Sequence, residues 1–291
     1  MKIIIIKILI IAVSILTLGQ DSIAQAVKYS NEFLAIGVGA RALGMSKATV
    51  ATVNDVTSGY WNPAGLTGLK KDISVGLMHS EYFAGIAKYD YASIASKIDD
   101  KSSIGFSYIR FGVDDIPNTI NLIDNNGNVN YNNITSFSAI DNAFLLSYAR
   151  KTGVEGLSVG LNAKVIYRKI GDFAQAWGFG LDLAAQYEYK KWNFGAVLRD
   201  ATSTFNAWSY SLDQNTIDVF QKTGNEIPEN GLELTLPRLI LGVGREFEIK
   251  KFAVLPELNF VTTFDGQRNT LIQGDPVSID PHMGVEVGYS K

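Results

Sequence analysis

The sequence predicts an all-β fold, a transmembrane antiparallel β-barrel, and three observations support this fold class. Ten stretches alternate apolar residues with small or polar ones at period two, which is the spacing of side chains along a strand. These stretches follow an N-terminal segment typical of exported proteins. Their connections sort into short and long ones, as in barrels with tight periplasmic turns and long outer loops.

Residues 1–24 are predicted to be a signal peptide. Lys2 and Lys7 form its charged region, and residues 8–18 form an apolar core that is too short to span a bilayer. Small residues place the cleavage site before Gln25 or before Val27. The alternative is an uncleaved anchor. We therefore expect export, with the outer membrane of a Gram-negative cell as the destination.

The composition excludes several classes of protein. Removal of Lys2, Lys7 and Asp21 with the signal leaves 24 Lys and Arg against 28 Asp and Glu, a net charge of −4. This weakly acidic balance, with no basic cluster, argues against nucleic acid as a partner. The absence of cysteine excludes disulfides and a thiol nucleophile. No stretch after the signal reaches 18 consecutive apolar residues, so we expect no transmembrane helix.

The predicted strands and their connections follow a regular order. The strands are expected at 72–80, 87–98, 102–111, 142–150, 155–169, 175–189, 191–200, 237–248, 251–264 and 282–290. Connections after the second, fourth, sixth and eighth are short, whereas 112–141, 201–236 and 265–281 are long. A Greek-key sandwich has no reason to sort its connections in this way, so the pattern favours a barrel.

Strand 175–189 shows which face of the sheet meets lipid. One face carries Trp177, Phe179, Leu181, Leu183, Ala185, Tyr187 and Tyr189, and the other carries Gly178, Gly180, Asp182, Ala184, Gln186 and Glu188. Trp177 and Tyr187 lie roughly 33 Å apart along a strand, or about 25 Å once it is tilted, which is the height of a barrel's apolar band. The alternative, a soluble β fold, would leave glycine-rich rows on its surface, where glycine weakens strands. The sequence therefore favours apolar rows facing lipid and small residues facing the lumen.

Residues 33–66 carry a long, ordered set of motifs before the first strand. The motifs are Gly39-Ala40-Arg41-Ala42-Leu43-Gly44-Met45, Val50-Ala51, Asn54-Asp55 and Tyr60-Trp61-Asn62-Pro63-Ala64-Gly65-Leu66. This segment resembles the N-terminal signature of the PorV/PorQ family of outer-membrane proteins, which are related to FadL-type barrels. The resemblance implies a hatch, residues 25–71, plugging a barrel of about fourteen strands that begins at residue 72 and runs to residue 291. The hatch residues it singles out are Gly39, Arg41, Gly44, Met45, Asn54, Asp55, Asn62, Pro63, Ala64 and Gly65.

Two features of the hatch can be interpreted physically. Asn62 is a good helix cap and Pro63 suits a first helical turn, so we expect a short helix to begin there. Arg41 and Asp55 either pair with wall residues such as Asp182, Glu188 or Lys164, or are solvated loop charges.

The strand count differs from the one that the resemblance implies. Ten strands are expected from the pattern, and the sequence ends on Lys291, where a periplasmic turn should begin. We therefore expect the barrel to be incomplete at its C-terminal end. A ten-stranded barrel is the alternative, since ten is an even number.

The function expected from the resemblance is a part in type IX protein secretion, in which exported proteins and machinery subunits are the partners beside outer-membrane lipid. Loop 201–236 offers Phe205, Trp208 and Tyr210 as apolar contacts for a partner. The alternative is FadL-type uptake of hydrophobic small molecules, for which an inward row with Lys164, Asp182 and Glu257 is a poor lining. We expect no enzyme, cofactor or metal site, because His79 and His282 lack cysteine or spaced carboxylate partners.

Overall fold

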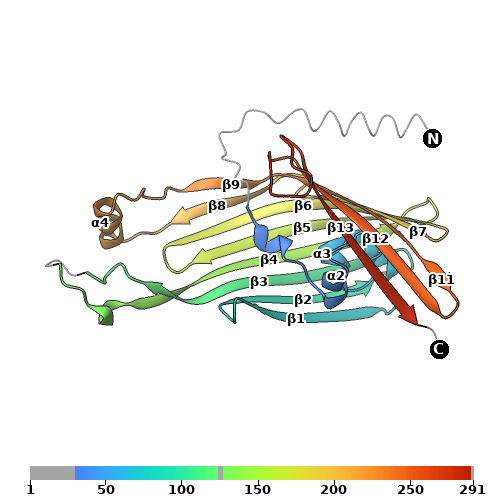
Figure 1. Cartoon of the computed structure of the whole chain (residues 1–291), viewed down its shortest axis with the longest axis horizontal. Helices are drawn as coiled ribbons and strands as arrows, with labels where there is room; N and C mark the ends of the chain where they lie inside the picture. Colours follow the sequence, from blue (N-terminus) through green and yellow to red (C-terminus); the bar gives the residue numbers. More distant parts are fainter. Residues whose placement is uncertain (1–29, 124–126, 290–291) are drawn as a thin grey trace.

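The computed structural model describes residues 30–123 and 127–289, and the predicted signal peptide lies outside them. Thirteen described strands form one antiparallel sheet that curls around a short N-terminal hatch (Figure 1). The strands are β1 (Ile73–Tyr82), β2 (Ala87–Lys97), β3 (Ser102–Asn118), β4 (Thr135–Lys151), β5 (Leu157–Ile170), β6 (Ala174–Tyr189), β7 (Trp192–Arg199), β8 (Thr204–Tyr210), β9 (Gly231–Thr235), β10 (Arg238–Arg245), β11 (Phe247–Ile249), β12 (Phe252–Thr263) and β13 (Ser278–Tyr289). The helical elements are η1 (Glu32–Ala35), α2 (Ala40–Gly44), α3 (Ser58–Trp61), η2 (Pro63–Gly68), η3 (Tyr131–Asn133) and α4 (Gln214–Lys222). None of these described helices is long and apolar enough to cross a membrane.

The all-β barrel fold predicted from the alternation is confirmed, and every predicted strand is present. The wall follows the order β1-β2-β3-β4-β5-β6-β7-β10-β12-β13, with each strand antiparallel to the next. The small strands β8, β9 and β11 are additions to this wall: β8 pairs with β6 and β9, and β11 pairs with β12. Two predicted loops are shorter than expected. The segment 201–236 continues the sheet as the β8–β9 hairpin and carries α4, and the segment 112–141 is reduced because β3 runs to Asn118 and β4 begins at Thr135.

The apolar rows face outward, as the sequence predicts. Trp177 and Leu183 on β6 are 49% and 50% exposed, whereas Asp182 between them is 3% exposed on the lumen side. Since the exposed side of the wall is the apolar side, hydrocarbon rather than a dry protein interior is its solvent. A soluble sandwich would show the reverse burial.

The glycines of the inward rows make room for the hatch backbone. A Cβ atom on Gly160 of β5 would lie 2.3 Å from the backbone nitrogen of Ala64. One on Gly195 of β7 would lie 2.4 Å from the Val50 carbonyl oxygen, and one on Gly284 of β13 would lie 2.4 Å from the Met45 carbonyl oxygen. No larger residue fits these places without moving main chain. The hatch therefore rests directly on the wall.

The two ends of the wall differ in their connections. The β6–β7 turn is residues 190–191 and the β11–β12 turn is residues 250–251, whereas the β3–β4 and β12–β13 connections span 119–134 and 264–277 at the opposite end. Short turns mark the periplasmic end of such barrels, so the long connections lie outside the cell. Pro256 is accommodated because the β10 ladder with β12 ends at Glu257, one residue away.

One seam of the wall is open in the described structure. Within residues 30–123 and 127–289, β2 is the only strand paired with β1, and β12 is the only strand paired with β13, which also makes a single bridge from Ile279 to Ile272 of the preceding connection. The hatch contacts both edges of this seam: the Gly39 N–H lies 3.2 Å from the Met78 sulfur on β1, and Arg41 Nε lies 2.8 Å from Glu286 Oε2 on β13. The hatch thus connects the first and last wall strands.

Candidate functional site

The hatch is held in its bend by Asn62, as the cap prediction requires. The Asn62 side-chain oxygen accepts a hydrogen bond from the Ala64 N–H at 3.1 Å, and Pro63 occupies the first turn of η2. The Asn62 amide donates to the carbonyl oxygens of Val50 at 2.8 Å and of Ala185 on β6 at 3.1 Å. Because Asn62 is fully buried, one side chain both shapes the hatch and ties it to the wall.

The two predicted hatch charges behave differently from each other. Arg41 pairs with the wall, but its partner is Glu286 on β13 and not one of the residues named from the sequence. Asp55 has no wall partner among the described residues; its carboxylate accepts hydrogen bonds from the backbone N–H and hydroxyl of Thr57, at 2.7 and 2.6 Å. Asp55 therefore closes a local turn, whereas Arg41 fixes the hatch to the edge of the barrel.

The remaining hatch-motif residues serve the backbone. Gly39 has a φ of 82°, a left-handed conformation that favours glycine. A Cβ atom on Gly65 would lie 2.2 Å from the Val53 carbonyl oxygen, whereas one on Gly44 would meet nothing within 4 Å. Met45 and Ala64 are buried, Asn54 is exposed, and Met45 and Ala64 lie against Gly284 and Gly160.

The buried wall residue Glu257 is a hatch anchor that the sequence did not single out as such. Its carboxylate accepts hydrogen bonds from the Ala51 N–H at 2.8 Å and the Thr52 hydroxyl at 2.5 Å. Arg199 on β7 donates to the Tyr60 carbonyl oxygen at 2.7 Å, and its guanidinium lies 4.9 Å from the Tyr60 ring. Both residues occupy lumen-facing positions of the period-two pattern, and this position is the sequence signal that could have identified them as hatch contacts.

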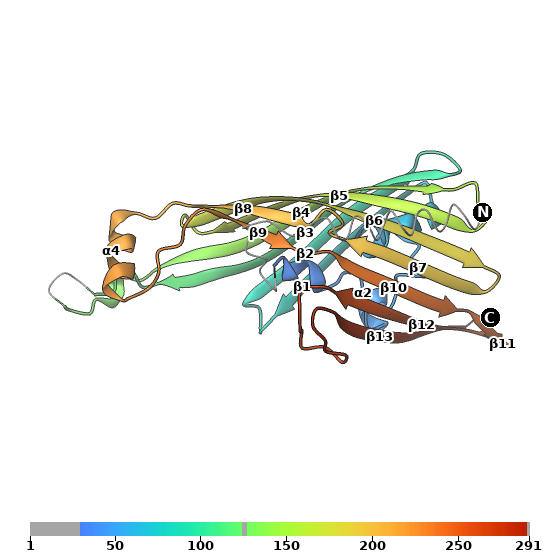
Figure 2. The same ribbon diagram turned by 90° about the horizontal axis from the view of Figure 1, so that it is seen from above.

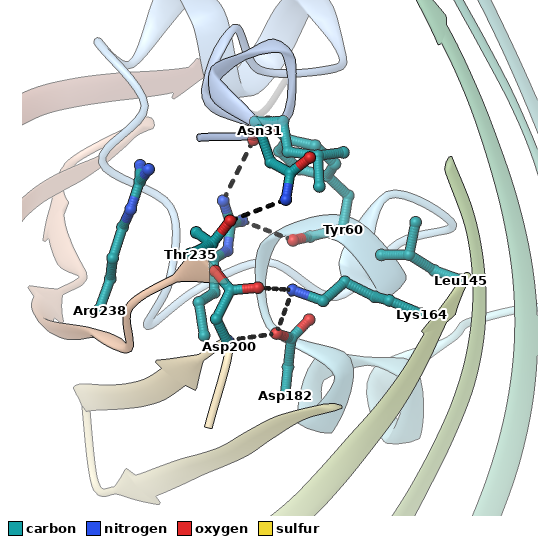
Figure 3. Close-up of a pocket in the computed structure, with 10 residues that line it drawn as sticks. Asn31, Tyr60, Leu145, Lys164, Asp182, Asp200, Thr235 and Arg238 are labelled. Carbon is teal, nitrogen blue, oxygen red and sulfur yellow. Dashed lines mark hydrogen bonds and ion pairs between the residues drawn. The ribbon is translucent and has the colours of Figure 1, made fainter. Parts of the chain in front are cut away.

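A buried ion cluster lies beside the hatch, where β7 leaves β6 and β8 takes its place (Figure 3). Lys164 on β5 donates to Asp182 on β6 at 2.8 Å and to Asp200, which follows β7. Asp182 also accepts from the Asp200 N–H at 2.9 Å and from Asn162 at 3.1 Å. The cluster therefore fixes the position at which the wall changes partners.

Among the described residues, cavities lie against the hatch on several sides, and charged side chains line those beside Lys164, Lys47 and Glu286. The cavity beside Lys164, Asp182 and Arg199 has a volume of about 30 Å³. An outer cavity of about 190 Å³ is lined by Val50 of the hatch, and an inner one of about 1010 Å³ by Ala51 to Val53. Consecutive hatch residues thus form the partition between the outer and inner spaces.

The outer cavity contains a basic hatch residue. Lys47 lines it and donates to the Ala35 carbonyl oxygen at 2.9 Å. Burial lowers the pKa of Lys47, and the charge of Arg199 adds to this effect against the opposing charge of Asp280. A site of this polarity suits polar contacts better than a hydrocarbon chain.

The long outer connections build a projection, which we call the outer extension: residues 114–123 and 127–138 of the β3–β4 hairpin and residues 204–235 with β8, α4 and β9 (Figure 2). The carboxylate of Asp213 caps α4 by accepting a hydrogen bond from the Thr216 N–H at 2.7 Å. Asn215 on α4 donates to Asn121 at 2.7 Å and so joins the two parts. Exposed apolar side chains of the outer extension are Ile123, Val129, Tyr131, Ile134, Ile227 and Leu232.

The predicted partner-binding residues all lie on β8, but they do not share a face. Phe205 points outward, 5.8 Å from the Phe179 ring of the lipid-facing row. Trp208 donates to Glu233 on β9 at 2.6 Å, has Arg168 over its ring at 5.1 Å, and stacks with Tyr210 at 6.0 Å. Trp208 and Tyr210 therefore stabilise the hairpin, and the most exposed apolar groups of the outer extension are others, such as Ile123 and Tyr131.

Comparison with known proteins gives a family match and a fold match. A family model described as "Type IX secretion system protein PorV" matches residues 19–206. The chain is similar in structure to the "CymD monoaromatic hydrocarbon channel", with a TM-score of 0.50 and 15% identity over 88% of this chain and 80% of that one. A Pseudomonas aeruginosa FadL homologue matches with a TM-score of 0.26 and 9% identity over 84% of this chain and 95% of that one. No curated protein sequence matches the chain.

Proposed function

The chain belongs to the PorV family of type IX secretion system proteins, and from this premise we propose that it binds exported proteins at the outer end of its barrel and passes them on within that system. The general role, an outer-membrane component of type IX secretion with a FadL-like barrel, follows from the family and the fold. The proposal adds the place and the manner of binding. It also includes export by the predicted signal peptide, residues 1–24.

The outer extension is the observation that carries the proposal. It is built from regular strands and a capped helix, so its apolar groups stand in fixed positions. On the β3–β4 part of the outer extension, Tyr131 is 74% exposed and Val129 is 55% exposed. Exposed apolar side chains among polar ones, on an ordered support, are typical of surfaces that bind proteins.

Uptake of hydrophobic small molecules is the second candidate, and the fold likeness to a hydrocarbon channel is the observation that favours it. The hatch supports secretion instead, because the cavities on both of its sides are lined by charged groups such as Lys47, Arg199 and Glu286. A chain of hydrocarbon would leave these groups without their polar partners.

The test is capture of secreted proteins by the double variant Tyr131→Ser/Ile134→Ser in native membranes. Loss of two apolar contacts at an interface is expected to lower capture about thirtyfold, since each costs about 1 kcal/mol. Leu271→Ser, on the separate β12–β13 loop and 78% exposed, is the matched control and should capture as the parent does. Unchanged capture by the double variant would contradict the proposal, and a tightly held hydrocarbon in the purified protein would favour uptake.

A further inference from the structure

Arg245 lies on the outer face of the wall at the periplasmic end. It is the last residue of β10 and pairs in register with Trp192, the first residue of β7. Its guanidinium carbon lies 4.8 Å from the Trp192 ring and 4.9 Å from the Phe247 ring. Trp192 and Phe247 are exposed on the lipid-facing side, where aromatic residues mark the level of the lipid headgroups.

This arginine has no counter-charge among the described residues. No carboxylate oxygen lies within 4.0 Å of its guanidinium in that part of the chain, and its Nε is buried without a hydrogen-bond partner. The neighbouring acids Glu246 and Glu248 line the inner cavity instead, and Glu248 pairs with Lys191 at 3.2 Å. A buried donor on a cation is costly when it is left unpaired, so Arg245 is poised for an external anion.

Basic residues lie in two neighbouring turns at the same end of the wall as Arg245. The β6–β7 turn carries Lys190 and Lys191, and the β11–β12 turn carries Lys250 and Lys251. The turns are neighbours because β10 pairs with β7 on one side and with β12 on the other. The Lys190 ammonium lies 5.2 Å from the Tyr189 ring, which is also on the lipid-facing side. Folding thus gathers a basic patch from positions far apart in the sequence.

We propose that Arg245, with the lysines of the β6–β7 and β11–β12 turns at the same end of the wall, binds the phosphate headgroup of an anionic phospholipid in the periplasmic leaflet of the membrane. The planar guanidinium can donate two hydrogen bonds to one phosphate group, and the aromatic rings hold its plane in place. The lysines supply the charge attraction that an anionic headgroup adds over a zwitterionic one. The lipid is the occupant because the site ends the apolar outer row, where Phe194 and Leu241 are exposed to acyl chains.

The test is a titration of the full chain in detergent micelles, followed by native mass spectrometry. The probes are dioleoyl phosphatidylglycerol, dioleoyl phosphatidylcholine and inorganic phosphate. We expect phosphatidylglycerol to bind most tightly and Arg245→Gln to weaken it about fivefold, which corresponds to the loss of one basic residue at a membrane surface. Arg245→Lys keeps the charge without the planar fork and should lie between the two.

Arg150→Gln is the matched control. Arg150 is also an exposed arginine at the periplasmic end of the wall, but its charge lowers the pKa of the Asp99 carboxyl, and no aromatic ring of the described residues lies over its guanidinium. Its variant should bind phosphatidylglycerol as the parent does. Equal weakening by both variants, equal binding of phosphatidylcholine by the parent, or unchanged binding by Arg245→Gln would each overturn the proposal. Tight binding of inorganic phosphate alone would show an anion site that does not recognise lipid, and would overturn it as well.

Discussion

Replacement of Lys164 by methionine tests the buried ion cluster beside the hatch. Lys164 is 4% exposed and pairs with the carboxylates of both Asp182 and Asp200. Methionine keeps most of the volume, so the packing term is small. The variant leaves two buried carboxylates facing each other, and removal of one partner from a buried ion pair costs about 3–5 kcal/mol. The free energy of unfolding should fall by about this amount.

The assay is urea unfolding of the chain in phospholipid vesicles, followed by tryptophan fluorescence. Lys169→Met is the control, because Lys169 is about half exposed and pairs with the fully exposed Asp172 at 3.3 Å. A surface pair of this kind contributes less than about 1 kcal/mol. If Lys164→Met unfolds within 1 kcal/mol of the parent, the cluster does not hold the wall at the β7–β8 break, and the reasoning is refuted.

Three further predictions concern the hatch and the outer loops. Gly65→Ala should destabilise the chain by about 3 kcal/mol, because the new methyl group would press on the Val53 backbone. Gly44→Ala should be neutral or stabilising within about 1 kcal/mol. Coinciding urea unfolding midpoints of the two variants would contradict this. Asp213→Ala removes the cap of α4 and should speed amide hydrogen exchange over residues 214–222, while exchange in β5 stays unchanged. Burial opposes the charge of Asp265, yet the hydrogen bond and charge of Arg268 outweigh burial and lower its pKa. The loop order that this pair supports is therefore complete above the ordinary carboxyl pKa and lost as the pH falls through the lowered one. Proteolysis of residues 264–277 should therefore rise only in acid. The Asp265→Asn variant should be cut at the same rate in acid and at neutral pH.

Period-two alternation was enough to find the wall, because the pattern is local and each wall strand repeats it. The strand at 175–189 was predicted with its outward and inward rows, and the structure places β6 at Ala174–Tyr189 with those faces. The membership predicted from residues 33–66 is confirmed by the family match. This short segment was enough to identify the family because its motif residues determine the backbone conformation of the hatch.

The sequence could not predict contacts that depend on curvature and register. Arg41 lies 245 residues from Glu286, and only the closing of the sheet brings them to 2.8 Å. β8 was missed because Trp208 and Tyr210 place large rings on the inward row, which breaks the alternation that marked the other strands. The basic patch around Arg245 was invisible for the same reason, since its turns are neighbours only in the folded wall.

The touching of hatch main chain against wall glycines has a consequence for biogenesis. The carbonyl oxygens of Met45 and Val50 lie close to where a methyl group on Gly284 or Gly195 would be, so a preformed hatch has no clearance to slide past these glycines along the wall. We therefore expect the hatch and the wall to assemble together. The hatch is synthesised first and acts as the template around which the later hairpins pair. If a chaperone or insertase released the wall strands before the hatch was in place, we expect the wall to collapse with its lumen unfilled.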